Sequence, residues 1–387
     1  MTIQMFEKPL GMRDDFPSIV KRKSKLSKVG IKIMEQFGYE MLQTPSLEYY
    51  ETIGKISAIA DNQLFKLLDN QGQTLVLRPD MTSPIARVAA SKLLKEKMPV
   101  RLGYYSNVFR AQLREGGRPA EFEQMGVELI GDESLYADAE VILLATEILR
   151  GLNVGSGRIV IGHTQLLQQV LRGYGLDDAL AEKLRAEMVA KNKVAYENMV
   201  DNLVDDTAAK SSLKLIMNTT RLEDWEQWID QTDTVQQSLY EDMRKLKTLL
   251  DRNGLADFVT YDLSFTSHMT YYTGMVFEIY GEGSGFPLGN GGRYDGLMKQ
   301  FGLHVGATGF GLRVDRLLEA MPAEQENTEQ TLILFNEENE ENAHIEANKL
   351  RKAGERVTLQ FASAVKAQEE FSSLFSKVIR MDGEENG

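Results

Sequence analysis

Apolar residues recur at helical spacing close to the start of the chain. Between Pro17 and Phe37 they alternate with lysines and arginines in the three- to four-residue rhythm of an amphipathic helix. Gly38 follows directly, and glycine is common just past a helix C-terminus. The pattern therefore predicts a first helix over this range.

Several shorter apolar runs predict β-strands. Two of them, Leu102–Arg110 and Glu121–Ile130, are joined by a polar loop over Gln112–Ala120 that is rich in Gly and Arg. This arrangement predicts a long antiparallel hairpin. The other predicted strands are Tyr39–Leu47, Gln73–Leu77, Arg158–Gly162, Phe258–Leu263 and Met275–Tyr280.

The stretch from Thr164 to about Ala256 differs from the rest of the chain. It contains no convincing strand and is dense in Leu, Ala, Lys, Glu and Asp at helical spacing. A further helix is predicted just before it, over Tyr136–Leu152. We interpret residues 164–256 as an all-helical insertion, about the size of a small domain.

The last third of the chain contains two glycine-rich segments, Gly281–Gly292 and Gly306–Gly311. We interpret them as tight turns and close backbone approaches, with a ligand-facing role as the alternative. A helix over Arg313–Met321 and a polar, acidic linker over Pro322–Gln330 follow. The remaining predicted elements are the strand Thr331–Phe335, the helix Asn342–Ala353, the strand Arg356–Phe361 and a frayed last helix.

Consecutive antiparallel strand pairs, with helices clustered before and after them, indicate an α+β fold rather than a doubly wound parallel sheet. At 387 residues the chain exceeds an ordinary domain of about 100 to 200 residues. The predicted domains are a core over residues 1–322, interrupted by the insertion at 164–256, and a small C-terminal domain over residues 331–387.

Composition narrows the class of protein. Hydrophobic residues make up 42% of the chain, yet no apolar run approaches the roughly 20 residues needed to span a bilayer. Met1–Pro9 lacks the apolar stretch of a signal peptide. The absence of cysteine excludes disulfides, thiolate metal sites and cysteine nucleophiles. These features predict a cytoplasmic protein with no membrane partner.

Charge and motif content argue against further classes. The formal net charge of −13 disfavours a nucleic-acid binder, although a local basic face can lie within an acidic total. The four histidines are scattered, with no two at i,i+3 or i,i+4, so each is interpreted as structural and no metal site is predicted. Phosphate-loop, zinc-protease and serine-hydrolase motifs are absent, and no cofactor is predicted.

Four separated stretches are more specific when they are considered together. They are Leu77–Thr82 (LRPDMT), Val108–Gln112 with Glu121–Glu128 (VFRAQ and EFEQMGVE), Tyr271–Glu278 (YYTGMVFE), and Gly289–Gly296 (GNGGRYDG) with Gly309–Leu317. With Gly11–Asp14 (GMRD), this constellation resembles histidyl-tRNA synthetase, a class II aminoacyl-tRNA synthetase. The resemblance covers about residues 8–320 and implies a class II synthetase-like core, in which an antiparallel sheet is flanked by helices.

The same resemblance implies a histidine-binding pocket. Spacing alone places Gln124 and Glu128 on one face of a strand, where either a polar ligand or a satisfied polar core would account for them. By resemblance, Asp80, Thr82 and Gln124 hold the amino and carboxyl ends of histidine, and Glu128 and Tyr272 bind its imidazole. The implied histidine-binding residues are Asp80, Thr82, Arg110, Gln124, Glu128, Tyr271, Tyr272 and Tyr294.

The chain departs from the synthetase pattern where the family reacts with ATP. The family's R-G-L-D-Y-Y motif begins here at Ser267, which replaces the activating arginine, and His268 is not expected to reach the same point. The phosphate-facing Arg110 is kept, but Gln112 replaces a carboxylate, and Arg313 replaces a glycine beside the nucleotide. Losing one fixed group that stabilises the charge developing in the transition state raises the activation free energy by about 2.7–4 kcal/mol in comparable sites. No aminoacylation is therefore predicted.

The C-terminal domain departs as well. Thr331–Phe361 resembles the start of the family's anticodon-binding domain, but too few residues follow for the complete sheet. The acidic run Asn336–Glu341 would repel RNA phosphates, and it would equally suit a solvated helix N-terminus. We predict a truncated anticodon-binding-like α/β domain and no tRNA partner.

With these departures the chain is similar to the regulatory subunits of ATP phosphoribosyltransferase, which are non-catalytic paralogues of histidyl-tRNA synthetase. That resemblance implies a hetero-oligomer with the short-form catalytic subunit, in the first step of histidine biosynthesis, and histidine as the feedback effector. It also implies a homodimer formed through the N-terminal helix and strand, Pro17–Leu47. The alternatives are a divergent active histidyl-tRNA synthetase and a stand-alone amino-acid sensor for another partner.

Overall fold

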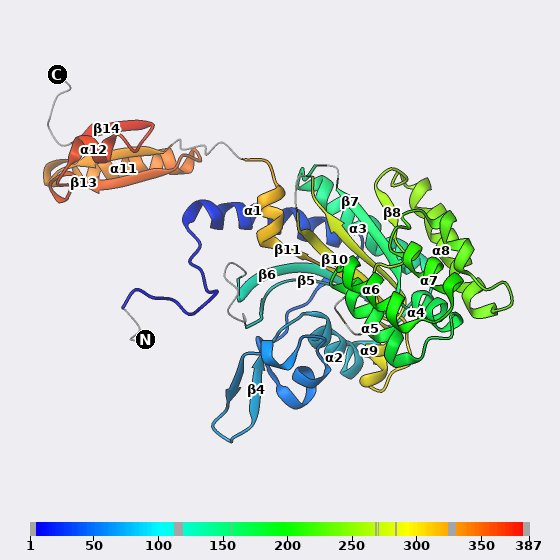
Figure 1. The fold of residues 1–387 in the computed structure, drawn as a ribbon. Coiled ribbons are helices and arrows are strands. Elements are labelled where there is room, and N and C mark those ends of the chain that lie inside the picture. Colours follow the sequence, from blue (N-terminus) through cyan, green and yellow to red (C-terminus); the bar gives the residue numbers. More distant parts are fainter. Residues whose placement is uncertain are drawn as a thin grey trace. The chain divides into compact units, whose positions relative to one another are not determined.

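The structure is a computed structural model that describes residues 5–111, 119–155, 157–267, 269, 271–282, 285–323 and 330–381. The chain divides into two compact units, Met1–Pro322 and Ala323–Gly387. Figure 1 shows a large sheet with helices in the first unit and a short sheet with its own helices in the second. Each unit buries hydrophobic clusters of its own.

An eight-stranded sheet forms the centre of the larger unit, in the order β1-β5-β6-β11-β10-β9-β7-β8. Neighbouring strands are antiparallel except at the two edges, where β1–β5 and β7–β8 are parallel. The predicted hairpin is confirmed as the pair β5–β6. The strands are β1 (Glu40–Met41), β5 (Val100–Phe109), β6 (Glu121–Ile130), β7 (Arg158–His163), β8 (Val259–Tyr261), β9 (Met275–Tyr280), β10 (Pro287–Arg293) and β11 (Ala307–Arg313).

The two faces of this sheet pack against different helices, α2 and α9 on one face and α1 and α3 on the other. There α1 and α3 pack against each other, and their apolar side chains join Met125, Val127 and Leu129 of β6 in the largest hydrophobic cluster. The predicted first helix and the helix over 136–152 are confirmed to within one residue at either end. The helices of this core are α1 (Pro17–Gln36), α2 (Thr82–Ser91), α3 (Leu135–Gly151), α9 (Asp295–Gln300) and α10 (Val314–Ala320).

The helical insertion is also confirmed, since residues 164–252 are all described and hold no strand. Its five helices are α4 (Thr164–Gly173), α5 (Asp178–Val189), α6 (Lys193–Leu203), α7 (Thr207–Ile216) and α8 (Thr234–Arg252). Each begins with a side chain that accepts a hydrogen bond from a free backbone N–H of the first turn. These capping residues are His163, Asp177, Asn192, Asp206 and Asp233. Buried Trp225 adds to the core beneath these helices.

At the two glycine-rich segments the predicted close backbone approach is confirmed, but the predicted turns are wrong for most of the residues. Most of these residues form β10 and β11, which are central strands of the sheet. Glycine is disfavoured in strands on propensity alone, but here larger residues would not fit. A Cβ on Gly291 would lie 2.4 Å from the carbonyl oxygen of Gly309, and one on Gly289 would lie 2.5 Å from that of Gly311. The glycines therefore permit an unusually close approach of neighbouring backbones.

The prediction of one strand over Tyr39–Leu47 is also wrong. The segment contributes β1 to the large sheet and then starts a separate three-stranded sheet, of order β2-β4-β3, near Pro45. Proline lacks the N–H that a continuous strand needs, so the chain changes sheet here. The strands of the small sheet are β2 (Leu47–Tyr49), β3 (Lys66–Leu68) and β4 (Thr74–Leu77).

The smaller unit is a parallel sheet of order β13-β12-β14. The acidic run of the sequence includes Glu340 and Glu341 in the first turn of α11, where carboxylates complement the helix dipole. The last strand, β14, was not predicted. The elements are β12 (Thr331–Phe335), α11 (Glu340–Lys352), β13 (Val357–Phe361), α12 (Gln368–Ser372) and β14 (Lys377–Met381).

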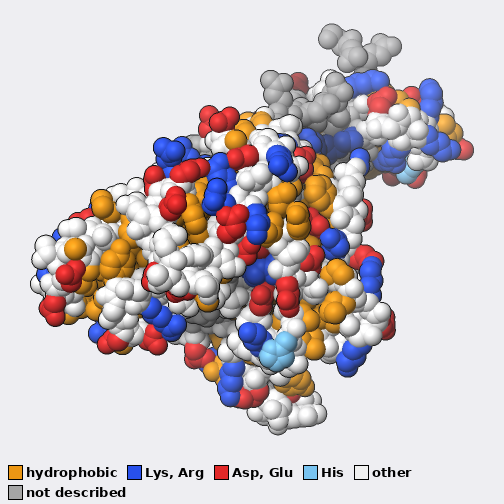
Figure 2. All heavy atoms as spheres, turned by 90° about the vertical axis from the view of Figure 1, so that its right-hand side faces the viewer, with side chains coloured by type: hydrophobic (Ala, Val, Ile, Leu, Met, Phe, Trp, Pro, Cys, Tyr) orange, Lys and Arg blue, Asp and Glu red, His pale blue; other side chains and the backbone are white. Residues whose placement is uncertain are grey.

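Among the described residues, no helix is both long and apolar enough to cross a membrane. Likewise, no group of three or more metal-ligating side chains is placed to hold an ion within the described ranges. On the face shown in Figure 2, basic and acidic side chains are interspersed instead of gathering by sign.

Candidate functional site

The sheet face opposite α1 and α3 carries Gln124 and Glu128 on β6. Gln124 lies over Gly311 of β11, where an added Cβ would come within 2.1 Å of its Nε2 atom. Glu128 lies over Gly309 in the same way, because a Cβ added to Gly309 would lie 2.1 Å from the Oε2 atom of Glu128. The predicted shared face is confirmed, and the glycines opposite provide the room for both side chains.

Glu128 is the most deeply buried acid of this face. It is 1% exposed and accepts a hydrogen bond of 2.5 Å from the hydroxyl of Tyr294. Burial raises the pKa of Glu128 to about 8, although hydrogen bonds from Tyr294 and Thr82 act to lower it. The carboxyl is therefore largely protonated near neutral pH, and an additional donor or cation would favour its ionised form.

Three tyrosines form an aromatic wall beside Glu128. The Tyr271 ring meets Tyr272 at a centroid distance of 5.0 Å and Tyr294 at 5.9 Å, both edge to face. All three side chains are buried, and burial raises the pKa of each hydroxyl. The hydroxyls therefore stay protonated at neutral pH and can donate hydrogen bonds to a ligand.

Asp80 and Thr82 reach the same place from the N-terminus of α2. The Asp80 carboxylate is 2% exposed and accepts hydrogen bonds from the backbone N–H of Ser83, at 2.8 Å, and from the hydroxyl of Ser57, at 2.6 Å. Its charge helps to raise the pKa of Glu128, so the two carboxyl groups face one site. Ser57 is a member that the sequence did not indicate, because nothing in its spacing links it to Asp80.

Arg110 and Arg313 flank the ring of Phe122. The guanidinium carbon of Arg313 lies 3.8 Å from the ring centroid, and that of Arg110 lies 5.4 Å away. Asp315 holds Arg313 with two hydrogen bonds of 3.1 and 2.7 Å, and Arg110 donates to the Pro79 carbonyl at 2.9 Å. The Phe122 ring face is thus already occupied by a flat cationic group that is fixed in place.

Ser267 is the residue that replaces the activating arginine of the synthetase family. Its hydroxyl accepts a hydrogen bond of 3.1 Å from the backbone N–H of Met269, so it serves the local turn. His268 and Gln112, the other departures noted in the sequence, lie outside the described residues.

The structure therefore brings the eight sequence-predicted residues to one face of the sheet. The site offers a buried carboxyl, a second carboxylate, an amide, hydroxyl donors and an aromatic wall. This combination suits a small polar molecule with N–H donors and a planar ring. The stacked pair Arg313–Phe122 and its holder Asp315 were not predicted, because strand β11 was not recognised in the sequence.

Two family models match the chain. One, described as histidyl-tRNA synthetase, covers residues 11–317, and the other, described as the C-terminal domain of histidyl-tRNA synthetase HisZ, covers residues 332–383. Two curated relatives are each named ATP phosphoribosyltransferase regulatory subunit. The one from Lysinibacillus sphaericus is 49% identical over 99% of this chain and 100% of its own, and the one from Bacillus subtilis is 43% identical over 99% and 100%.

Solved structures give the same result. A crystal structure described as an ATP phosphoribosyltransferase regulatory subunit/histidyl-tRNA synthetase, from Bacillus halodurans, superposes with a TM-score of 0.91 at 42% identity, over 99% of this chain and 100% of its own. Histidyl-tRNA synthetase from Nostoc superposes with a TM-score of 0.77 at 19% identity, over 96% and 89%. The second likeness concerns the fold alone, and both agree with the predicted class II synthetase-like core.

Proposed function

The chain belongs to the family of ATP phosphoribosyltransferase regulatory subunits, which share the histidyl-tRNA synthetase fold, and we propose that it senses histidine for a short-form catalytic subunit. The regulatory role in histidine biosynthesis follows from the family. In the proposal, the partner condenses ATP with phosphoribosyl pyrophosphate, and histidine bound to this chain inhibits that reaction. The complex acts in the cytoplasm and uses neither tRNA nor a membrane.

The surroundings of Glu128 support histidine as the effector. An imidazole N–H would give the buried carboxyl the donor that favours its ionised form. The hydroxyl of Tyr272 is protonated and would satisfy the other ring nitrogen, while Asp80 would meet the ammonium group of the ligand. Each part of histidine thus has a partner of matching chemistry, and none of these contacts requires a reaction.

The observation that carries the non-catalytic part of the proposal is the stack of Arg313 on Phe122. A planar base would need an aromatic face of this kind, yet the face is taken by a guanidinium that Asp315 holds by two hydrogen bonds. Displacing that group would break the bidentate ion pair and the cation–π contact together. The pocket can therefore keep its amino-acid side while its nucleotide side is closed.

Exchange of pyrophosphate into ATP in the presence of histidine tests this closure. We expect no exchange from the chain, and none from Ser267→Arg, because restoring one arginine leaves Arg313 on Phe122. A genuine histidyl-tRNA synthetase in the same assay is the positive control. Histidine-dependent exchange by either form would identify the chain as an active synthetase and refute the proposal.

The proposed homodimer has support in the small sheet that follows α1. Cross-strand pairing places Leu47 beside Leu77, and Tyr49 and Leu67 on either side of Leu75, all on one face. Leu47, Tyr49 and Leu67 are 45%, 55% and 44% exposed, so the face is apolar and open to water. A second copy of the chain would bury it, in line with pairing through the N-terminal helix and strand.

Tyr49→Arg is expected to convert the dimer to a monomer, because it places a charge at the middle of that apolar face. Sedimentation of the isolated chain at micromolar concentration measures the change. Leu68→Arg is the matched control, since Leu68 lies on the opposite face of the same sheet and is already 74% exposed. A wild-type chain that sediments as a monomer, or a Tyr49→Arg chain that remains dimeric, would contradict this interface.

A further inference from the structure

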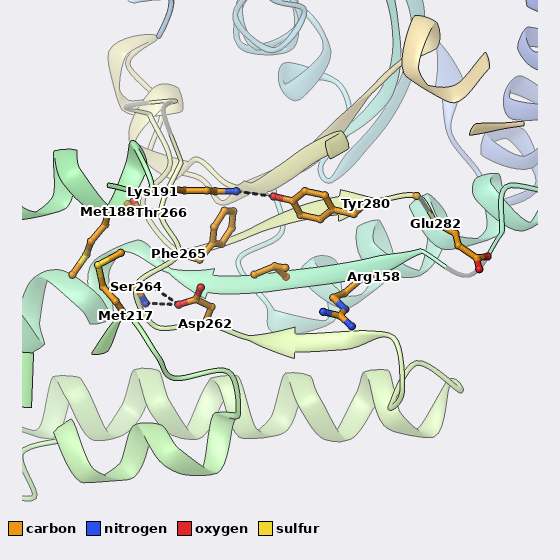
Figure 3. A pocket seen from close by; sticks show the side chains of 12 residues that line it. Arg158, Met188, Lys191, Met217, Asp262, Ser264, Phe265, Thr266, Tyr280 and Glu282 are labelled. Atoms are coloured by element: carbon orange, nitrogen blue, oxygen red, sulfur yellow. Dashed lines mark hydrogen bonds between the residues drawn. The ribbon is translucent and has the colours of Figure 1, made fainter. Parts of the chain in front are cut away.

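A cavity lies between the sheet and the helical insertion. Its volume is about 600 Å³, within the range of small-molecule sites. Its walls come from β7 and β9, from the loop after β8, and from the C-terminal ends of α5 and α7 (Figure 3). Segments distant in the sequence therefore meet around one space.

This cavity is separate from the site at Glu128, although both lie on the same face of the sheet. Cross-strand register joins Glu128, Gly309, Gly292 and Val276 in one row across β6, β11, β10 and β9. Tyr280 lies four residues beyond Val276 on β9, so it points to the same face and lines the cavity. Three strand spacings of about 4.8 Å place β9 roughly 14 Å from β6.

The insertion reaches the sheet at this cavity through Lys191. Its ammonium group hydrogen-bonds the Tyr280 hydroxyl at 2.8 Å and lies 3.6 Å from the Glu278 carboxylate. The Lys191 backbone has a φ of 54°, a left-handed conformation that is uncommon outside glycine. The surrounding structure thus holds this residue in place, and a ligand in the cavity would contact both the insertion and the core.

One end of the cavity carries the carboxylate of Asp262. Its Oδ1 accepts hydrogen bonds from the N–H of Ser264 at 2.9 Å and from the hydroxyl of the same residue at 2.7 Å, as Figure 3 shows. Burial raises the pKa of Asp262, although the bonds from Ser264 oppose this effect. A fixed, partly desolvated carboxylate of this kind favours a ligand with N–H donors.

The guanidinium of Arg158 lies on the other side of the cavity, where Glu282 also lines the wall (Figure 3). Strands β7 and β8 are parallel, and Tyr261 pairs with Ile161, so the next residue, Asp262, lies beside Gly162. Gly162 is four residues beyond Arg158 in the sequence of β7. The two backbone positions are thus about 13 Å apart along the strand direction, at roughly 3.3 Å per residue. A ligand that carries an N–H donor at one extreme and an anion at the other would complement both groups.

The part of the cavity beside Asp262 suits a flat ring. The backbone N–H of Phe265 donates to the Asp262 carbonyl at 3.1 Å, so the two residues are neighbours, and Met188 and Met217 lie on the insertion side (Figure 3). Aromatic and thioether side chains pack well against planar heterocycles. We propose that this cavity binds an adenine mononucleotide, with the exocyclic amine on Asp262, the base against Phe265 and the phosphate on Arg158.

Binding of AMP and of IMP to the full-length chain tests the proposal, because the two differ only where Asp262 would make its contact. AMP presents its exocyclic amine at C6 there, whereas IMP presents a carbonyl oxygen at C6, which the carboxylate would repel, and carries its N–H at the neighbouring N1 position. By calorimetry we expect saturable AMP binding and IMP binding at least about tenfold weaker, the usual result when a buried polar group loses its partner.

Four variants make the test specific. Asp262→Asn should bring AMP and IMP to similar affinity, since an amide can pair with either group, and Arg158→Ser should weaken AMP but leave adenosine unchanged. Asp205→Asn, an exposed change in the insertion, is the control. Glu128→Ala should leave AMP binding intact, which separates this site from the histidine site. Absence of saturable AMP binding at millimolar concentration, or equal AMP and IMP affinity in the wild type, would overturn the proposal.

Discussion

Replacing Glu128 with alanine is expected to raise the histidine concentration that half-inhibits the complex by about 5- to 150-fold. The change removes the buried acceptor, so an imidazole N–H would be left unpaired inside a closed pocket. Such a loss typically costs about 1–3 kcal/mol, at 1.4 kcal/mol per tenfold change in affinity. Activation of the catalytic subunit in the absence of histidine should be largely kept. Inhibition curves of the assembled complex measure both quantities.

Glu128 has a structural alternative that the same experiment separates. If its bond to Tyr294 only stabilises a polar core, Glu128→Ala should lower thermal stability, weaken assembly and reduce activation together. Glu121→Ala provides the matched control, because Glu121 lies on the same strand and is exposed. Unchanged histidine sensitivity in a well-assembled Glu128→Ala complex would place the effector site elsewhere, with the interface to the catalytic subunit as the next candidate.

Replacing Gly309 with alanine is expected to lower the free energy of unfolding by about 3 kcal/mol or more, at the upper end of the cost of overpacking. The new Cβ would lie 2.3 Å from the backbone oxygen of Val127 and 2.1 Å from Oε2 of Glu128. The side chain of Glu128 can move aside, but the carbonyl of a central strand cannot move without disturbing the sheet. Denaturant unfolding of the purified chain measures the change.

Gly173→Ala is the control for that prediction. Gly173 is the last residue of α4, and a Cβ there would meet only the Gln236 amide nitrogen, at an ordinary 3.7 Å. Alanine is a better helix former than glycine, so this variant should be as stable as the wild type or slightly more stable. Equal stability of the Gly309 and Gly173 variants would show that the close approach of β6 and β11 is not required.

Local patterns in the sequence were enough for the first helix, for α3 and for the helical insertion, whereas α2 and α9 were not predicted. In α1, apolar residues at helical spacing include the buried Leu26 and Met34, and Gly38 beyond it has a φ of 82°, as expected just after a helix. The insertion was recognisable for the same reason, because its helices repeat apolar residues at helical spacing. Such signals lie within one element and need no knowledge of its neighbours.

Strands β10 and β11 could not be predicted in this way. Their glycines are unfavourable locally and are required because backbone oxygens of neighbouring strands, and the side chains of Glu128, Gln124 and Phe277, occupy the space where side chains would lie. The stack of Arg313 on Phe122 could not be predicted for the same reason. It forms because β11 pairs with β6, which places Arg313 opposite Gln124. The grouping of the candidate site was reached through resemblance, since spacing alone related only Gln124 to Glu128.

The rate of product formation by the short-form catalytic subunit tests the central claim most directly. It should be measured for that subunit alone, with this chain added, and with both chain and histidine present. We expect a low rate alone, a marked increase with the chain, and loss of that increase as histidine is raised. A rate that does not respond to the chain, or a stimulated rate that histidine leaves unchanged, would contradict the account of this protein as a histidine-sensing regulatory subunit.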